Sequence, residues 1–247
     1  MHRTTVHLMR HGEVHNPDGI LYGRLSGYRL SERGHQMASR VAETLHDGGH
    51  DVRAVVASPL QRAQQTAEAT ARAYGLAVRT DPRLIEADNH FEGTAVNVNR
   101  WELARPRHWL AYTNPVRPSW GEPYRTQVRR LRDAVVAVLD EVAGGEAVLV
   151  SHQLPIWVTR RHLQGKPLAH DPRRRECSLA SLTSLTFDGR RLVDVRYWEP
   201  AADLLVGAWD MVPGTSPAEL PATATSTVAD DAEAATPDLS EKDGTTA

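Results

Sequence analysis

The sequence predicts an α/β protein with a mostly parallel sheet covered by helices on both faces. Short apolar runs alternate along the chain with longer segments whose apolar residues recur at helical spacing. The run Thr4 to Met9 and the segment Ser31 to Asp47 begin this alternation, and Ala147 to Val150 followed by Pro155 to Leu163 repeats it. Strands joined through helices usually lie parallel, with the helices on the sheet faces. We therefore expect a three-layer sandwich.

The first half of the chain supplies two strand–helix units. In the first helix, Ser31 to Asp47, the opening serine is a suitable N-cap. A short buried strand follows at Ala54 to Ala57. The second helix begins near Pro59, where proline is tolerated, and runs to about Tyr74, with Gly75 as its end signal.

The second half supplies a core-packing helix, a further strand–helix unit and a hairpin. Valine and leucine recur at helical spacing from about Tyr124 to Val142. Two apolar segments near the end of the folded region, Ser178 to Phe187 and Arg191 to Trp198, are separated by Asp188-Gly189. Because Asp-Gly favours a tight turn, these segments are expected to form a hairpin at the sheet edge.

Composition indicates one folded domain followed by a tail. A chain of 247 residues is long enough for one well-buried domain, which we place at residues 1–211. Residues 212–247 are rich in Ala, Thr, Pro and acidic residues and almost lack large apolar side chains. Such a composition cannot offset chain entropy, so we expect this tail to be disordered.

Charge and cysteine content restrict the expected partners and location. A formal net charge of -2 gives no reason to expect binding to nucleic acid or to an anionic membrane. A single cysteine, Cys177, rules out an internal disulfide, and the N-terminus has no apolar stretch of signal or membrane-span length. We expect a cytoplasmic protein, whereas its oligomeric state does not follow from the sequence.

The segment Arg10-His11-Gly12-Glu13 directly follows the first predicted strand. Ligands of open α/β sheets bind in the crevice beyond the carboxyl ends of the strands, so His11 is expected to face a pocket. The guanidinium of Arg10 suits phosphate, and Gly12 allows the backbone to come close to a ligand. These three residues suggest chemistry on a phosphate.

Further motifs follow in order and complete a recognisable pattern. With this set the chain resembles the histidine phosphatase superfamily, also called the phosphoglycerate mutase-like family, from about Val6 to Trp198. The motifs that carry the resemblance are Arg10-His11-Gly12-Glu13 with Asn16, Leu30-Ser31-Glu32-Arg33-Gly34, Ser58-Pro59-Leu60 with Arg62 and Gln65-Thr66-Ala67, Leu84-Ile85-Glu86, and Ser151-His152.

Each candidate catalytic residue has a chemical reason for its role. A neutral imidazole can attack phosphorus, so His11 is the expected nucleophile and a phosphohistidine the expected intermediate. The three equatorial oxygens of the transferring group need cationic donors, which Arg10, Arg62 and a protonated His152 would supply. The leaving oxygen needs a proton, and the motif position favours Glu86 as the donor, with Glu92 as the competitor.

Other site residues are less well determined by the pattern. The family pattern implies that Asn16 donates its amide to the phosphate, although a turn-forming role before Pro17 is an alternative. Ser58 is either a pocket residue or a helix cap. The substrate pocket is expected to include four residues: Tyr22, Gly23, Ser58 and Gln153.

Several positions depart from the usual family pattern without removing a catalytic group. Gln153 replaces a small residue or Asn, and Tyr22 stands where a small hydroxyl residue is common. In this family the region at about 89–124 caps the site, and here it is rich in Trp and Tyr. The run Arg173-Arg174-Arg175 is either a solvated loop or a contact for a second anionic group.

Taken together, the resemblance implies a metal-independent phosphomonoesterase that needs no cofactor and acts on a small phosphorylated metabolite. Two alternatives stay open. A phosphoglycerate mutase-type transferase would use the same residues, and a non-catalytic family member would bind a phospholigand or act as a scaffold.

Overall fold

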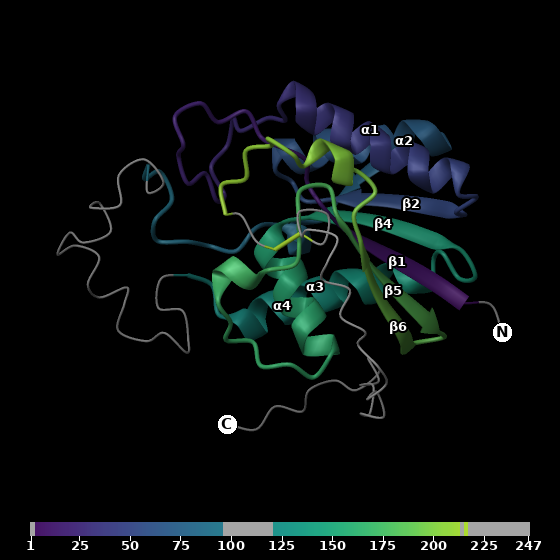
Figure 1. Ribbon diagram of the computed structural model, residues 1–247. Coiled ribbons are helices and arrows are strands. Elements are labelled where there is room, and N and C mark those ends of the chain that lie inside the picture. The colour runs from purple at the N-terminus through teal and green to yellow at the C-terminus, as the bar shows by residue number, and fades with distance from the viewer. Residues whose placement is uncertain (1–2, 96–120, 213–214, 217–247) are drawn as a thin grey trace, which may run out of the picture.

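A mixed sheet of six strands forms the middle layer of the protein (Figure 1). The computed structural model describes residues 3–95, 121–212 and 215–216. The strand order is β3-β2-β4-β1-β5-β6. The first four strands are parallel to one another, β5 is antiparallel to β1, and β6 is antiparallel to β5. The strands are β1 (Arg3–Arg10), β2 (Val52–Ala57), β3 (Val78–Thr80), β4 (Glu146–Ser151), β5 (Leu182–Asp188) and β6 (Arg191–Trp198).

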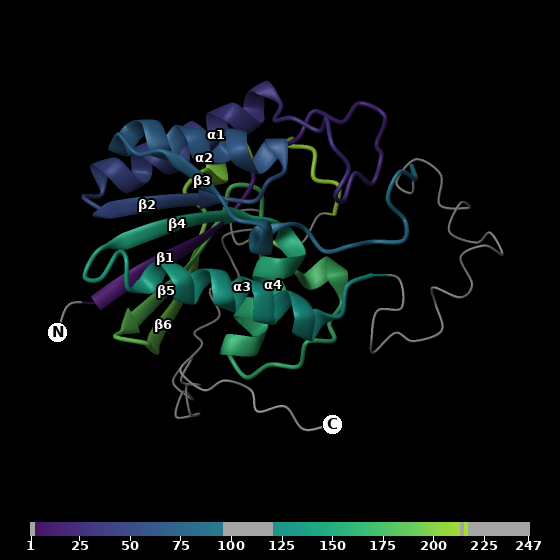
Figure 2. The ribbon, with the colours of Figure 1, turned by 180° about the vertical axis from the view of Figure 1, so that it is seen from behind.

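Two pairs of helices cover the two faces of this sheet. Helices α1 (Glu32–Asp47) and α2 (Gln61–Tyr74) lie on one face, and α3 (Tyr124–Leu139) and α4 (Gln153–Leu163) lie on the other (Figures 1 and 2). The predicted three-layer α/β sandwich is confirmed.

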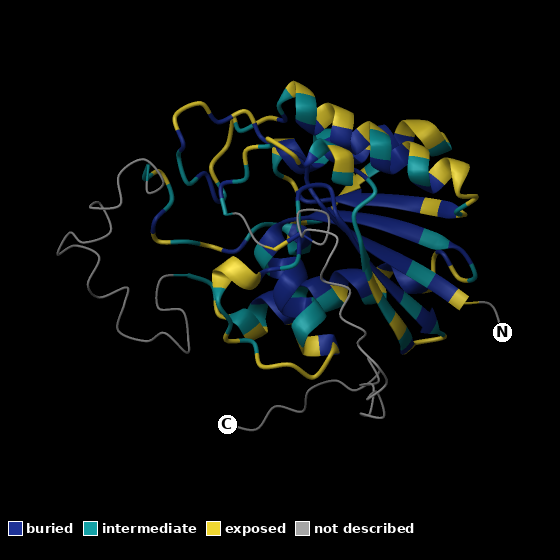
Figure 3. Cartoon of the chain, viewed as in Figure 1, coloured by how far each residue is buried: buried dark blue, intermediate teal, exposed yellow. Residues whose placement is uncertain are grey.

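The core is divided by the sheet into two apolar clusters. Alternate residues of a strand point to opposite faces, so in β1 Leu8 packs with the α3 and α4 side and Met9 with the α1 and α2 side. Both side chains are fully buried. The central strands are therefore buried on both faces, while exposed residues gather on the outer surfaces of the helices (Figure 3).

Local signals in the sequence agree with several element boundaries. The Ser31 side chain caps α1 by accepting a hydrogen bond from the Gly34 amide, and Gly75 ends α2 in the left-handed conformation. The hairpin of β5 and β6 turns at Gly189, which also has a positive φ. These three predictions are confirmed.

Other boundaries differ from the expectation for identifiable reasons. The edge strand β3 has only three residues, none of them buried, so no apolar run announced it. Helix α4 begins at Gln153 rather than Pro155, because proline is tolerated in a first turn whose N–H groups have no helical partner. Helix α3 ends at Leu139 rather than Val142.

Much of the expected lid and tail lies outside the described residues. Of the lid at about 89–124, residues 96–120 are not described, and an antiparallel bridge between Asn89 and Gly121 joins its two ends. Of the tail at 212–247, the described residues Val212, Thr215 and Ser216 contact the domain through hydrogen bonds. None of the described helices is long and apolar enough to cross a membrane. A cytoplasmic location stays a prediction.

The register of the two central strands determines where the site lies. β1 and β4 are parallel neighbours, and Arg10 is paired with Ser151. The residue that follows each of these strands is a histidine, so His11 and His152 lie side by side at the edge of the sheet. The crevice beyond the strand ends, expected from the sequence, therefore contains both imidazoles.

A close backbone approach between Gly12 and Gly34 should be needed for this arrangement. A Cβ at Gly12 would lie 2.6 Å from the Gly34 carbonyl oxygen. Because the obstacle is backbone, we expect Gly12→Ala to destabilise the protein by about 1–3 kcal/mol and to reduce any activity that depends on His11. Chemical denaturation would measure the loss, and a free energy of unfolding equal to that of the wild type would contradict the assignment.

Candidate active site

The His11 ring is held in the tautomer that a nucleophile requires. Its Nδ1 lies 2.8 Å from the Gly12 carbonyl oxygen, which can only accept, so Nδ1 carries the proton. The lone pair is therefore on Nε2. Burial, together with Arg62 and Arg10, holds the pKa of His11 well below its usual value of 6.5. The imidazole is neutral and can use Nε2 to attack an electrophile, and the group that orients it is a carbonyl next to it in the chain.

Two buried arginines beside His11 have N–H groups with no partner among the described residues. Nε of Arg10 and both Nε and Nη1 of Arg62 are buried and donate no hydrogen bond to any described residue. Arg10 is 3% exposed and Arg62 is 1% exposed. Leaving such donors unsatisfied is costly, and an anion placed beside His11 would satisfy them. This is the strongest evidence in the structure for a phosphate site.

His152 lies next to His11 and holds Arg62. The centroids of the two imidazole rings are 5.2 Å apart. Nδ1 of His152 lies 3.3 Å from Nη2 of Arg62, which can only donate, and Nε2 lies 2.8 Å from the Ser58 hydroxyl. A neutral His152 with its proton on Nε2 fits both contacts.

The expected protonation of His152 is not favoured by these surroundings. Burial, Arg62 and His11 lower the pKa of His152 well below 6.5. The charge on the site is consequently carried by the two guanidinium groups. A phosphate dianion next to His152 would favour its protonated form, so the protonated state depends on the ligand.

Arg62 is further fixed by the loop that contains Tyr22 and Gly23. Its Nη2 donates to the Gly23 carbonyl oxygen over 2.6 Å, and its Cζ lies 4.7 Å from the centre of the Tyr22 ring. Gly23 has a positive φ, and a Cβ there would collide with the Glu92 side chain. Tyr22 and Gly23, which were both expected in the pocket, therefore shape it by fixing the position of Arg62.

Asp210 is a site residue that sequence analysis missed. Its two carboxylate oxygens accept hydrogen bonds from Nη1 and Nη2 of Arg10, over 2.7 Å and 2.6 Å, and Nη1 also donates to the Cys177 carbonyl oxygen. The bidentate pair leaves Nε of Arg10 without a partner among the described residues. No sequence motif indicates Asp210, because it lies 200 positions from its partner Arg10, in the segment that follows β6.

Glu86 has the environment of a proton donor. It lines the pocket together with His11, and one carboxylate oxygen accepts a hydrogen bond from the Ala87 amide over 2.7 Å. Burial raises the pKa of Glu86 above its usual 4.5, although Arg62 and Arg130 oppose the change. Burial also raises the pKa of Glu92, which accepts from the Arg24 amide, but Glu92 is not among the residues that line the pocket. This geometry favours Glu86 over Glu92.

The remaining candidate residues have distinct positions. Asn16 uses both ends of its amide within its own loop, donating to the Ile20 carbonyl and accepting from the Ile20 amide. The loop-forming alternative accounts for these contacts, and a phosphate contact of Asn16 stays a prediction. Ser58 is fully buried and supports His152. It also accepts a long bond from the Leu60 amide.

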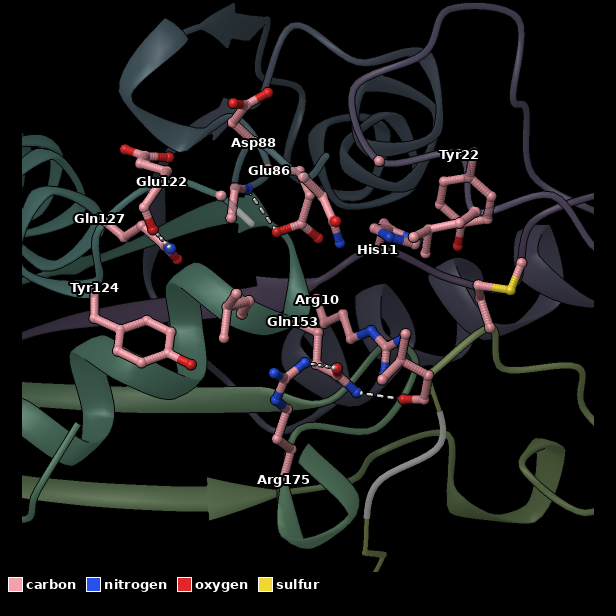
Figure 4. A pocket seen from close by; sticks show the side chains of 18 residues that line it. Arg10, His11, Tyr22, Glu86, Asp88, Glu122, Tyr124, Gln127, Gln153 and Arg175 are labelled. Carbon is pink, nitrogen blue, oxygen red and sulfur yellow. Dashed lines mark hydrogen bonds between the residues drawn. The ribbon is translucent and has the colours of Figure 1, made fainter. Parts of the chain in front are cut away.

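A pocket at the ends of β1 and β4 brings most of these side chains together (Figure 4). Arg62, His152 and Ser58 are buried beside it. Arg175 also lines the pocket, whereas Arg173 and Arg174 are exposed. The sequence-predicted residues in its wall are Arg10, His11, Tyr22, Gly23, Glu86 and Gln153.

One group of described side chains has the composition of a metal site. The donor atoms of His7, His50 and Glu146 lie within 4.8 Å of one another. However, Glu146 Oε2 accepts hydrogen bonds from both rings, over 2.7 Å and 2.8 Å, and these account for the cluster. Glu146 is the first residue of β4, so the group lies at the end of the strand opposite His152.

The chain belongs to the histidine phosphatase superfamily, branch 1, whose model matches residues 6–199. An uncharacterized protein of Mycobacterium tuberculosis is 55% identical over 199 residues, which cover 81% of this chain and 98% of that protein. A probable phosphoglycerate mutase of Yersinia enterocolitica is 33% identical over 185 residues, covering 71% of this chain and 82% of the relative.

Solved structures show the same fold. A mycobacterial glucosyl-3-phosphoglycerate phosphatase in complex with VO3 is 27% identical, with a TM-score of 0.63, and the match covers 81% of this chain and 99% of that one. A putative alpha-ribazole-5'-P phosphatase of Escherichia coli has a TM-score of 0.63 at 24% identity, covering 79% and 96%. The family assignment made from the sequence is confirmed.

Loss of the Asp210 carboxylate should misplace Arg10. We expect Asp210→Asn to lower kcat/KM for a phosphomonoester by up to about 100-fold, because small displacements of a charge-stabilising group are costly. Asp203→Asn is the matched control, since Asp203 lies in the same segment and pairs with the exposed Arg40. Steady-state kinetics would test this, and equal effects of the two substitutions would refute a specific role for Asp210.

Proposed function

We propose that the protein is a phosphomonoester hydrolase that acts through a phosphohistidine on His11. The observation that carries the proposal is the neutral His11 ring, with its Nε2 lone pair available, beside buried guanidinium donors that have no partner among the described residues. A neutral nucleophile and fixed cations are what phosphoryl transfer demands. The substrate is a small phosphorylated metabolite.

In the first step, Nε2 of His11 attacks phosphorus while the bond from phosphorus to the leaving oxygen breaks. The free N–H groups of Arg10 and Arg62 stabilise the charge on the equatorial oxygens. Glu86, whose pKa is raised by burial, gives its proton to the leaving oxygen. The products are an alcohol, a phosphohistidine and the Glu86 carboxylate.

In the second step, water attacks phosphorus and the bond to His11 breaks. The Glu86 carboxylate takes the proton of the attacking water, which restores the acid form needed for the next turnover. Inorganic phosphate leaves, and His11 returns to its neutral state. One carboxyl group serves both steps, so the proton balance over a cycle is zero.

Relatives support phosphoryl chemistry but divide between two outcomes. They include a mycobacterial glucosyl-3-phosphoglycerate phosphatase and a probable phosphoglycerate mutase. In a mutase the phosphohistidine would pass its group to a second substrate instead of water. The hydrolase is our proposal because the 66 positions from Glu86 to His152 are few for the inserted segment with which mutases enclose their substrate.

Replacement of His11 provides the first test. We expect His11→Ala to reduce phosphate release from p-nitrophenyl phosphate by at least about a thousandfold, since the nucleophile is lost. Brief incubation of the wild type with a 32P-labelled ester should give acid-labile, base-stable label on the protein, and the variant should give none. Label that persists in water without phosphate release would indicate a transferase, and release unchanged in the variant would refute the proposal.

Replacement of Glu86 should depend on the leaving group. We expect Glu86→Gln to lower kcat/KM for an alkyl phosphate by about 100- to 10,000-fold, because kcat/KM reports the first step, in which the alkoxide needs a proton. The effect on p-nitrophenyl phosphate should be smaller, since nitrophenolate leaves without one. Glu92→Gln is the matched control and should change neither rate by as much. An equal loss of kcat/KM on both esters would contradict proton donation by Glu86.

The pH dependence follows from the same two groups. The pKa of His11 is lowered below 6.5, so activity should rise as pH passes that lowered value and the ring becomes neutral. The pKa of Glu86 is raised above 4.5, so activity should fall as pH passes that raised value and the donor loses its proton. A bell-shaped profile of kcat/KM is expected for alkyl phosphates. Glu86→Gln should remove the alkaline fall, and a variant that keeps it would argue against this assignment.

A further inference from the structure

Arg175 differs from the two arginines that precede it. Arg173 and Arg174 are exposed, and Arg173 pairs with Asp171. Arg175 is only 9% exposed and lies in the pocket wall. The basic run is therefore not one solvated loop, because its last member turns into the site.

The guanidinium of Arg175 is held in place by two neutral partners. Its Nε donates to Nε2 of His170 over 2.9 Å, and its Nη1 donates to Oε1 of Gln153 over 3.1 Å. The Gln153 amide is oriented in turn, because its Nε2 donates to the Val212 carbonyl over 2.8 Å. Nη2 has no hydrogen bond to any described residue. Gln153, which departs from the usual family pattern, thus positions a cation.

The charge of Arg175 has no paired carboxylate within the described part of the chain. Of the other two buried pocket arginines, Arg10 pairs with Asp210, whereas Arg62 is held only by neutral groups among the described residues. Burial lowers the pKa of Arg175, although Tyr124 and Glu86 oppose the change. A buried cation that is rigidly held and lacks a counter-ion is a site for an anionic group of a ligand.

This cation is separate from the donors that face the transferring phosphoryl group. Figure 4 shows Arg175 and His11 on different sides of the pocket, with Gln153 next to Arg175. Tyr124 lies on the Arg175 side and also lines the pocket. A ligand that spans the pocket would place one end beside His11 and the other beside Arg175.

We propose that Arg175, positioned by Gln153, binds a second anionic group of the substrate, so the preferred substrates are phosphomonoesters that carry a carboxylate or a second phosphate. This proposal rests on the proposed hydrolase function. The free Nη2 supplies a charge-assisted hydrogen bond to that group, and Arg10 and Arg62 remain available for the phosphoryl group that is transferred.

Matched pairs of esters test the proposal in the full-length protein. Glycerol 3-phosphate and 3-phosphoglycerate differ by a carboxylate, and fructose 6-phosphate and fructose 1,6-bisphosphate differ by a second phosphate. We expect the wild type to prefer the more anionic member of at least one pair by about 10- to 100-fold in kcat/KM. The pair that shows the preference identifies the anionic group.

Substitutions then assign the preference to Arg175. Arg175→Gln should reduce it to less than about threefold, mainly by raising KM for the more anionic ester, while leaving hydrolysis of p-nitrophenyl phosphate within about threefold of the wild type. Arg174→Gln is the matched control, because it removes the same charge from the neighbouring exposed position. Gln153→Leu, which removes the acceptor for Nη1, should weaken the preference without removing the charge.

Three results would overturn the proposal: no preference in the wild type, an equal loss on both members of a pair in Arg175→Gln, or loss of the preference in Arg174→Gln. If no ester is hydrolysed, the proposed function fails, and binding decides the subsite separately. In that case thermal shifts of His11→Ala with each pair, compared with His11→Ala/Arg175→Gln, should show stronger stabilisation by the more anionic ester only when Arg175 is present. Equal shifts would refute the subsite.

Discussion

The parallel pairing of β1 with β4 is the constraint on which the site depends. It sets Arg10 opposite Ser151, so the residues that follow, His11 and His152, enter the same crevice with their rings 5.2 Å apart. Backbone hydrogen bonds in the centre of the sheet hold this register. Packing also fixes it, since a slip of one residue would move each side chain of β1 to the opposite face of the sheet. The relative positions of the two histidines are therefore fixed by the same interactions that stabilise the core.

Burial gives these groups their chemistry. The same loss of water that keeps His11 neutral also raises the pKa of Glu86, so a base and an acid of the required kinds occur in one pocket. A charged side chain that is buried away from water needs a compensating partner. Arg10 receives it from Asp210, whereas Arg62 is held by neutral groups, the Gly23 carbonyl and the His152 ring. The site consequently retains donors for an anion.

The segment after β6 completes the pocket by returning to the start of the chain. Its Trp209 amide donates to the Glu13 carboxylate, and that carboxylate also accepts from the Ser31 hydroxyl. Next to Trp209, Asp210 fixes Arg10, while Val212 orients Gln153 and through it Arg175. Thus one short segment contacts the first strand, the first helix and both ends of the pocket. Its position explains why changes far from His11 in sequence should alter activity.

The sequence by itself determined the family, the sandwich, and most helices and strands. It also predicted roles for His11, Arg10, Arg62, Glu86 and His152, which stay predictions. It could do so because strand periodicity, caps and short motifs are local, and the chemistry of each motif follows from its residue types. Only the tertiary structure decided that Gly12 orients His11, that Asp210 pairs with Arg10, and that Arg175 turns inward while Arg174 stays exposed. Arg10 and Asp210 are far apart in the sequence, so no local pattern links them. The burial of Arg175 depends on which segments pack against it, which the sequence does not show. The edge strand β3 was missed because three exposed residues leave no apolar pattern.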